Sequence, residues 1–304
     1  MQIMITIFNQ VLMMFLLAAV GLLLYRSGKI TDAGSKSIGN ILIYVSLPCV
    51  VVKGFMVERT TERLISLGVS TAAAVTIFLI GILIARICFK KDPMAVYAVS
   101  FPNPGFFGIP IILASLSEGA VFYVVPLVAC INMGQWTYGA NLLTGKTGRI
   151  TAKRVFTAPF MVGIIIGLLL FFTQLPLPGV LTTALNYCAG LNTPLAMFTV
   201  GIYLAQTNVL KMLKRVMDYK IAAARLVLVP LVTVAILTVL PASFNEIRYA
   251  LLIGMSSSVG SNIAVYAQLY DADYTYAVET VVISVLFSII TIPLIVGLAG
   301  LIWG

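Results

Sequence analysis

The chain has 304 residues, of which 61% are hydrophobic and only 10% are charged, and its formal net charge is +9. Soluble domains are about 45–50% apolar and about 25% charged, so this composition excludes a water-soluble globular protein. The mean hydropathy of +1.07 predicts an all-α integral membrane protein whose positive charges lie in loops that face an anionic membrane leaflet.

The residues that the chain lacks exclude several classes of function. Histidine is absent, which removes histidine proton relays, histidine metal ligands and Ser-His-Asp hydrolysis. The cysteines lie in or beside apolar runs, without CxxC spacing, and are interpreted as packing residues: Cys49, Cys88, Cys130 and Cys188. No basic stretch stands apart from the apolar segments, which excludes nucleic acid as a partner. We expect no enzyme activity, catalytic residue, metal or cofactor.

Runs of about 20 apolar residues predict ten membrane-spanning helices. The first run is long enough to span and lacks a preceding basic segment, so we interpret it as a membrane helix and not as a signal peptide. The predicted spans are residues 3–24, 38–55, 64–88, 94–116, 120–143, 155–172, 180–205, 221–240, 249–270 and 274–303.

The Lys and Arg residues of the loops predict the orientation. With both termini outside, the four outer basic residues are Lys53, Arg59, Arg63 and Arg248, and the other 15 of the 19 lie inside. The inner loop before the last span is acidic, but acidic residues contribute little to this rule. We therefore expect a multi-pass protein with both termini outside.

Corresponding features predict two inverted repeats of five helices each, at residues 1–143 and 155–304, joined by a cytoplasmic loop at 144–154. An odd number of helices per half requires the second half to insert upside down. Pro48 and Pro194 are central to the second and seventh spans, and Gly105 aligns with Gly260 in the fourth and ninth. Interruptions matched across two halves point to the binding site of a transporter.

The fourth span contains three prolines and two glycines within residues 101–110, which no ordinary helix accommodates. Unwound backbone inside a membrane must be buried in protein or reached by water. The side chain of Asn103 can pair with the freed backbone groups, or it can offer donors and an acceptor to a ligand. A kink required only for packing is the alternative interpretation.

The ninth span contains a run of small polar residues at 256–262, which predicts a second helix break. Amides at the start of a half-helix can hold a carboxylate, although close helix packing explains small residues equally well. Candidate substrate-binding residues are Asn103, Pro104, Gly105, Phe106, Asn132, Gln135, Ser257, Ser258, Gly260, Ser261 and Asn262. Candidate helix-break residues are Pro48, Pro102, Pro110 and Pro194.

Asn132 and Gln135 share one face of the fifth span with Trp136 and Gly139, a spacing that fits either ligand contact or helix–helix hydrogen bonds. Three hydroxyl residues repeat along the tenth span, where we expect a packing role: Thr280, Ser284 and Ser288.

Four charged residues lie at or inside predicted span ends. We expect Lys53, Arg86 and Arg225 to extend toward the membrane surface. Glu279 is an acid within a span and is the candidate coupling residue, although its place near the start of the tenth span favours a solvated position.

The sequence resembles the auxin efflux carrier family, which includes plant auxin exporters and bacterial permeases for malate or malonate. The matching motifs are Leu47-Pro48, the segment 103–110, Thr193-Pro194 with Gly201, and the segment 281–297 with Ser284, Ser288 and Pro293. The resemblance extends along the whole chain, and the segment 103–110 is its most specific part.

This resemblance implies that the fourth and ninth helices are broken and cross at the substrate site. It also implies a scaffold of the first, second, sixth and seventh helices beside a transport group. The family often has a proline at the ninth-helix crossover, where this chain has Ser258-Val259-Gly260, so we expect a softer break there. The short connection between the halves is typical of a compact bacterial permease of the inner membrane.

The function that we expect is secondary active transport of a small organic anion by alternating access, coupled to protons or sodium. The alternative is a sodium-coupled organic anion symporter of the bile-acid type, which shares the crossover architecture. We also expect a homodimer surrounded by membrane lipid.

The predicted orientation can be tested with a reporter that is active only in the cytoplasm. Fused after Gly304, the reporter should give no signal, whereas the same reporter inserted within 144–154 should give a strong one. A strong signal from the C-terminal fusion would contradict the orientation and the inverted repeat.

Overall fold

A computed structural model describes residues 2–144, 157–208 and 212–304, so the predicted connecting loop at 144–154 lies outside the described residues except for Thr144. The regular elements of these residues are all helical, and many contain prolines, π-helical turns or breaks. This architecture confirms an all-helical membrane protein.

Helical elements of different lengths make up residues 2–144. The elements are α1 (Gln2–Arg26), α2 (Asp32–Ile41), η1 (Leu42–Ser46), α3 (Leu47–Phe55), α4 (Thr61–Phe89), α5 (Pro93–Ser100), η2 (Pro104–Gly108), α6 (Ile109–Ser115), η3 (Glu118–Ala120), α7 (Val121–Gly134), η4 (Gln135–Gly139) and α8 (Ala140–Thr144). Consecutive elements from α2 to α3 and from η3 to α8 form continuous helical stretches.

Further helical elements follow in residues 157–208 and 212–304. The elements are α10 (Pro159–Thr173), α11 (Gly179–Gly190), α12 (Asn192–Gln206), α14 (Val216–Ala223), η5 (Ala224–Leu228), α15 (Val229–Leu237), η6 (Ala242–Phe244), α16 (Asn245–Ser256), α17 (Asn262–Leu269) and α18 (Tyr274–Trp303). The helical stretch that contains α14 begins five residues before the predicted start of its span.

Seven helical stretches in the described residues are long and apolar enough to cross a membrane. The other three predicted spans differ for identifiable reasons. Residues 94–116 and 249–270 are each divided by a break, and α10 has only 15 described residues.

Side chains of the loops fix where several helices begin. Thr31, Thr60, Asp92 and Asp273 each accept a hydrogen bond from the backbone amide three residues ahead, as N-cap residues do. The acidic loop before α18 therefore has a local structural function, because Asp273 caps that helix.

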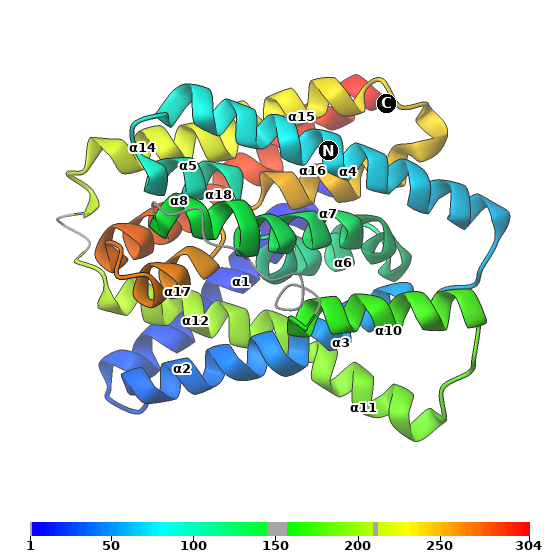
Figure 1. The fold of residues 1–304 in the computed structure, drawn as a ribbon, viewed down its shortest axis with the longest axis horizontal. Coiled ribbons are helices and arrows are strands. Elements are labelled where there is room, and N and C mark those ends of the chain that lie inside the picture. The colour runs from blue at the N-terminus through cyan, green and yellow to red at the C-terminus, as the bar shows by residue number, and fades with distance from the viewer. Residues whose placement is uncertain (1, 145–156, 209–211) are drawn as a thin grey trace.

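Two groups of helices are visible in Figure 1, with α2, α3, α10, α11 and α12 in the lower part and α4, α5, α14, α15 and α16 above, while α1 runs from the upper part toward the lower part. Helix α1 packs along α12, and α10 packs along α3. Met4 of α1 lies beside Gly297 of α18, so the two termini lie at the same end of the bundle.

Glycines allow the backbones of α1 and α12 to approach closely. A Cβ atom at Gly201 would overlap the carbonyl oxygen of Ala18, and one at Gly21 would overlap the carbonyl oxygen of Phe198. Small residues at such contacts are typical of membrane helix pairs. The close approach of α1 and α12 thus depends on Gly21 and Gly201.

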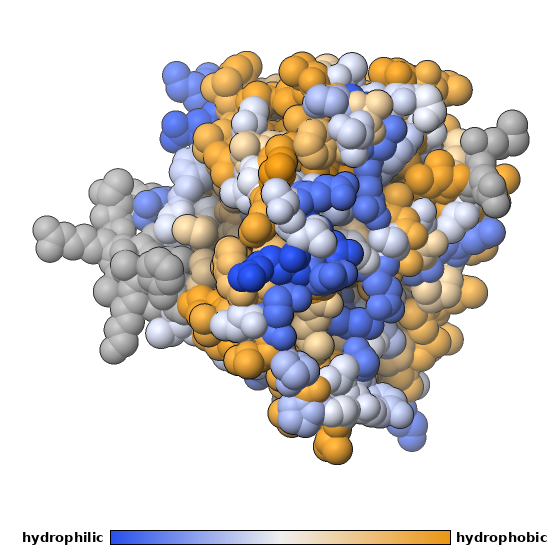
Figure 2. Space-filling model, turned by 90° about the vertical axis from the view of Figure 1, so that its right-hand side faces the viewer, coloured by the Kyte–Doolittle hydropathy of each residue, from blue (hydrophilic) through white to orange (hydrophobic). Residues whose placement is uncertain are grey.

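The surface is apolar along the helices and polar at the end of the bundle. Leu16, Leu79, Leu169 and Leu294 are each more than half exposed, which suits contact with lipid. Figure 2, viewed from the right-hand end of Figure 1, shows hydrophilic residues gathered near the middle of that end with hydrophobic residues around them. This distribution is that of a helix bundle seen along the membrane normal.

The close approach of α1 and α12 predicts the effect of one methyl group. Gly201→Ala should destabilise the protein by about 1–3 kcal/mol, because backbone atoms must move to admit the Cβ atom. Gly68→Ala is the matched control, since that helical glycine has open space around it. Thermal unfolding of the purified variants measures both, and equal stability would contradict the packing described here.

Candidate functional site

The two helix breaks lie against each other. The first separates α5 from η2 at residues 101–103, and the second separates α16 from α17 at residues 257–261. The Asn103 amide donates to the Ser258 carbonyl at 2.9 Å, and the Gly260 amide donates to the Phe101 carbonyl at 2.9 Å. Pro102 and Val259 thereby form a short antiparallel bridge that joins the halves of the chain.

The sequence explains why both helices stop here. Pro102 and Pro104 have no amide hydrogen to donate, so residues around them cannot form a regular helical ladder. At Gly260, a Cβ atom would lie 3.1 Å from the carbonyl oxygens of Phe101 and Pro102, and glycine permits this approach. The Val259 amide donates to the Ser284 hydroxyl of α18 at 3.0 Å. The Ser284 hydroxyl therefore satisfies a backbone amide of the second break, which is a role beyond the packing that we expected.

The second break is not softer than the first. Five residues lie outside helices at 257–261, compared with three at 101–103. The expectation based on the missing proline is wrong, because glycine and three serines leave the ninth span free to pair with the first break.

The other break candidates occupy tolerated positions. Pro48 and Pro110 lie near the starts of α3 and α6, and Pro194 lies in the first turn of α12. Each proline removes one backbone donor, and the π-helical turns just before Pro48 and Pro110, η1 and η2, are the kind of local adjustment that accommodates a proline in a membrane helix. These three residues mark local junctions, and only Pro102 lies in the crossover itself.

A small cavity of about 20 Å³ lies at the crossover. Its lining is Leu47, Pro102, Asn103, Pro104, Gly105, Phe106, Ile131, Asn132, Gln135, Gly260 and Asn262. The structure brings the candidate residues Asn103 and Asn262 to the lining of this one cavity. This volume holds about one water molecule, so a larger ligand requires the surrounding helices to separate.

The three candidate serines do not line this cavity. Ser257 donates to the Gly254 carbonyl at 2.6 Å, and the Ser258 carbonyl accepts from the first break. Ser261 is buried just before α17, and its carbonyl accepts from Ala264. The structure thus places these residues in the backbone of the crossover.

The amide side chains that line the cavity differ in the hydrogen bonds that they already make. Asn262 donates to the Gln135 side-chain oxygen at 3.0 Å, and Asn132 donates to the Val128 carbonyl at 2.8 Å. Asn103 is 7% exposed and makes no side-chain capping bond to η2. The side-chain amide of Asn103 is therefore available to a ligand in the cavity.

Two helix N-termini border the same cavity. The stretch η2–α6 begins at Pro104 and α17 begins at Asn262, and residues of both first turns line the cavity. The first amides of a helix lack intrahelical acceptors and carry a partial positive charge. This arrangement favours a negatively charged group.

Arg225 corrects a sequence-based expectation. We expected it near a span end, but its helix begins at Val216 and its side chain is completely buried. Its Nη1 atom donates to the Val99 carbonyl at 2.8 Å, and its Nη2 atom donates to the Met255 carbonyl. These carbonyls belong to the last turns of α5 and α16, so one guanidinium neutralises the negative ends of both half-helices.

Asn192 is a second residue that the sequence analysis missed. It begins α12, is 3% exposed, and donates to the Gly105 carbonyl at 2.9 Å. This bond connects α12 to the crossover from outside the broken helices. Its position next to the Thr193-Pro194 motif was the available signal.

Glu279 is also placed differently from our expectation. It is 4% exposed and not solvated, and it forms an ion pair with Arg215, with Oε2 and Nη1 2.8 Å apart. Glu279 does not line the crossover cavity, so a coupling role has to act through other residues. Lys53 pairs with the exposed Glu118, and Arg86 is itself exposed and donates to the hydroxyl of the half-buried Tyr138, as the positions of both near helix ends suggested.

Comparison with known proteins identifies relatives of the chain. The sequence profile of the family described as "Membrane transport protein" matches residues 6–156 and 145–296. A protein of Rhizobium meliloti (strain 1021) named "Putative malonate transporter" is 25% identical over 292 aligned residues, which cover 88% of this chain and 89% of that protein.

The contacts of Arg225 predict a large effect of its removal. Arg225→Met leaves two buried carbonyls without their donor, which should cost about 1–3 kcal/mol each. Arg225→Lys should restore part of the stability because it retains a charged donor. Arg86→Met, at an exposed arginine, is the control in thermal unfolding of the purified protein. Equal melting of Arg225→Met and Arg86→Met would contradict this role.

Proposed function

Because this chain belongs to the membrane transport protein family, we propose that it is a secondary active transporter that moves a small organic anion across the membrane by alternating access. The name of the Rhizobium meliloti relative makes a dicarboxylate such as malonate the first substrate to test. The expected absence of enzyme activity agrees with the family.

The observation that carries the proposal is the position of Asn103 and Asn262 in one cavity between two helix N-termini. A carboxylate there meets amide donors from both halves of the chain, while Arg225 stabilises the opposite, negative helix ends. The cavity therefore provides donors for an anion without a basic side chain in contact with it. The proposed ligand contacts are those of the predicted site residues that line the cavity.

A route on both sides of the cavity supports alternating access. Ile43, Leu47 and Val50 follow one another along the continuous helical stretch from α2 to α3. Ile43 lines a cavity of about 600 Å³, Leu47 lines the crossover cavity, and Val50 lines a cavity of about 630 Å³. The small central space thus lies between two larger ones, each of which is the size of a ligand cleft.

We include two inverted five-helix repeats, residues 1–143 and 155–304, in the proposal. Counting each broken helix as one span gives ten spans, and α5–α6 then corresponds to α16–α17. The reciprocal packing of α1 on α12 and of α10 on α3 supports this correspondence. The loop 144–154 would then be cytoplasmic and both termini would be outside, in a bacterial inner membrane.

The coupling ion and the homodimer are further parts of the proposal, and each has its own test. Transport that requires sodium would favour the bile-acid-type symporter. Light scattering of the purified protein would test the homodimer, for which α2 and α11 offer surfaces because they bury none of their residues within the chain.

The function can be tested with purified protein in liposomes. Uptake of radiolabelled malonate and of a panel of other carboxylates should exceed that of protein-free liposomes, because the cavity recognises a carboxylate group. Failure to move any organic anion, by a protein that is folded and inserted, would contradict the proposed function.

The Asn pair gives the specific prediction. Asn103→Ala and Asn262→Ala should each weaken substrate binding by about 1.5–3 kcal/mol, the usual value of a hydrogen bond to a charged group, and therefore by about ten- to 150-fold. Asn9→Ala, at an exposed position of α1, is the matched control. Concentration-dependent uptake measures all three, and parental affinity in both crossover variants would contradict the site.

A further inference from the structure

Asp218 is a buried acid that the proposed binding site does not use. Its side chain, in the first turn of α14, is fully buried, and neither carboxylate oxygen has a hydrogen-bond partner among the described residues. An ionised carboxylate loses its hydration in such a place and gains no donors in return. These surroundings favour the neutral carboxylic acid, which carries a proton.

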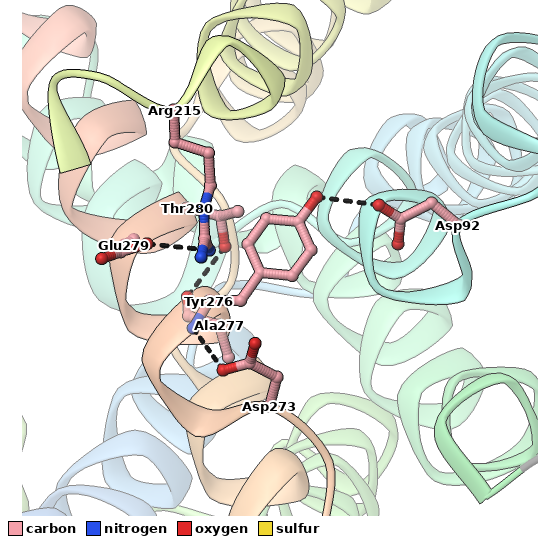
Figure 3. A network of polar contacts seen from close by, with 7 residues as sticks. All are labelled: Asp92, Arg215, Asp273, Tyr276, Ala277, Glu279 and Thr280. Carbon is pink, nitrogen blue, oxygen red and sulfur yellow. Dashed lines mark hydrogen bonds and ion pairs between the residues drawn. The ribbon is translucent and has the colours of Figure 1, made fainter. Parts of the chain in front are cut away.

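The nearest cation is already paired. Arg215 lies just before α14 and forms the 2.8 Å ion pair with Glu279 of α18, while its guanidinium lies 4.7 Å from the ring centroid of Tyr276. Figure 3 shows Arg215 between these two side chains. The Asp218 backbone amide donates to the Arg215 carbonyl at 3.1 Å. One half-exposed arginine, already paired with Glu279, therefore lies next to Asp218.

The elements packed against α14 supply no second free cation among the described residues. The facing elements are α18, η5 and α5. Besides Asp218, the charged or titratable groups of these elements, of α14 and of the residues that precede α5 and α14 are Asp92, Tyr97, Arg215, Tyr219, Lys220, Arg225, Tyr274, Tyr276 and Glu279. Asp92 caps α5 and accepts from the Tyr276 hydroxyl at 2.9 Å, Arg225 is bonded to two carbonyls, and Lys220 is exposed.

The elements around Asp218 are the same ones that hold the crossover. Arg225 lies seven residues, about two helical turns, beyond Asp218 on the same helical stretch. Ser284 lies five residues beyond Glu279 on α18 and accepts from the second break. Asp218 thus lies where α14 packs against α18, and the helical stretch of each carries a residue that bonds to the broken helices, Arg225 and Ser284.

We propose that Asp218 is a proton-binding site that couples anion transport to the proton gradient. A proton from water near half-exposed Arg215 binds a carboxylate oxygen of Asp218 and gives a neutral carboxylic acid. Glu279 keeps its ion pair with Arg215. When the proton leaves, the Asp218 carboxylate competes with Glu279 for Arg215. The coupling part of this inference rests on the proposed transport, whereas the protonation of Asp218 does not.

Infrared spectroscopy of the purified protein tests the protonation without any substrate. At pH 7 the parent should show the carbonyl band of a protonated carboxylic acid, and the band should disappear as the pH is raised. Asp218→Asn, which is similar in size and uncharged, should lack the band. Glu118→Gln, at a carboxylate whose side chain is 75% exposed, should retain it. A parent without the band, or a band that Asp218→Asn leaves unchanged, would overturn the inference.

Liposomes reconstituted with the parent protein or with Asp218→Asn test the coupling, and malonate is the probe. An imposed pH gradient should change malonate accumulation by the parent up to about tenfold per pH unit for one coupled proton. Asp218→Asn should still exchange malonate but should ignore the gradient. An equal gradient response in both proteins would overturn the coupling. A parent that moves no malonate under any gradient would count against the proposed function, while the infrared result would still decide the protonation of Asp218.

Discussion

The structure depends on the pairing of two broken helices through their own backbones. Inside a membrane no water is freely available to satisfy an amide or a carbonyl, so an isolated break is unfavourable. The two hydrogen bonds between residues 101–103 and 258–260 remove much of this cost. They also fix where the cavity lies, because η2 and α17 both begin beside the pair. The paired breaks therefore satisfy the backbone groups and also form the candidate site.

The same need to satisfy buried backbone groups explains the side chains that bond to the broken helices around the crossover. Each break exposes a negative helix end as well as a positive one, and Arg225 bonds to the carbonyls at the two negative ends. The positive ends remain for a ligand. Ser284 and Asn192 satisfy one amide and one carbonyl of the breaks from α18 and α12. Helices from different parts of the chain thus supply donors and acceptors that the broken helices cannot supply themselves.

The sequence predicted the membrane class and the positions of both breaks, because proline, glycine and serine in apolar spans have direct steric and polar consequences. It also singled out Asn103 and Asn262 as candidate binding residues, and both line the crossover cavity. It did not predict the burial of Arg225 or Glu279. Both lie near span ends in the sequence, and whether such a residue is buried depends on helix starts and neighbours that hydropathy does not report. The softer second break was wrong because the pairing of the breaks is a tertiary effect.

The central claim is that the crossover receives the anion once the helices around it separate. Its most direct test is an experimental structure of the protein determined with malonate bound. The account predicts malonate density within hydrogen-bond distance of both Asn103 and Asn262, in a cavity larger than about 20 Å³, with the pairing of the two breaks retained. Malonate bound only in one of the outer cavities, with both side chains unoccupied by ligand, would contradict the account.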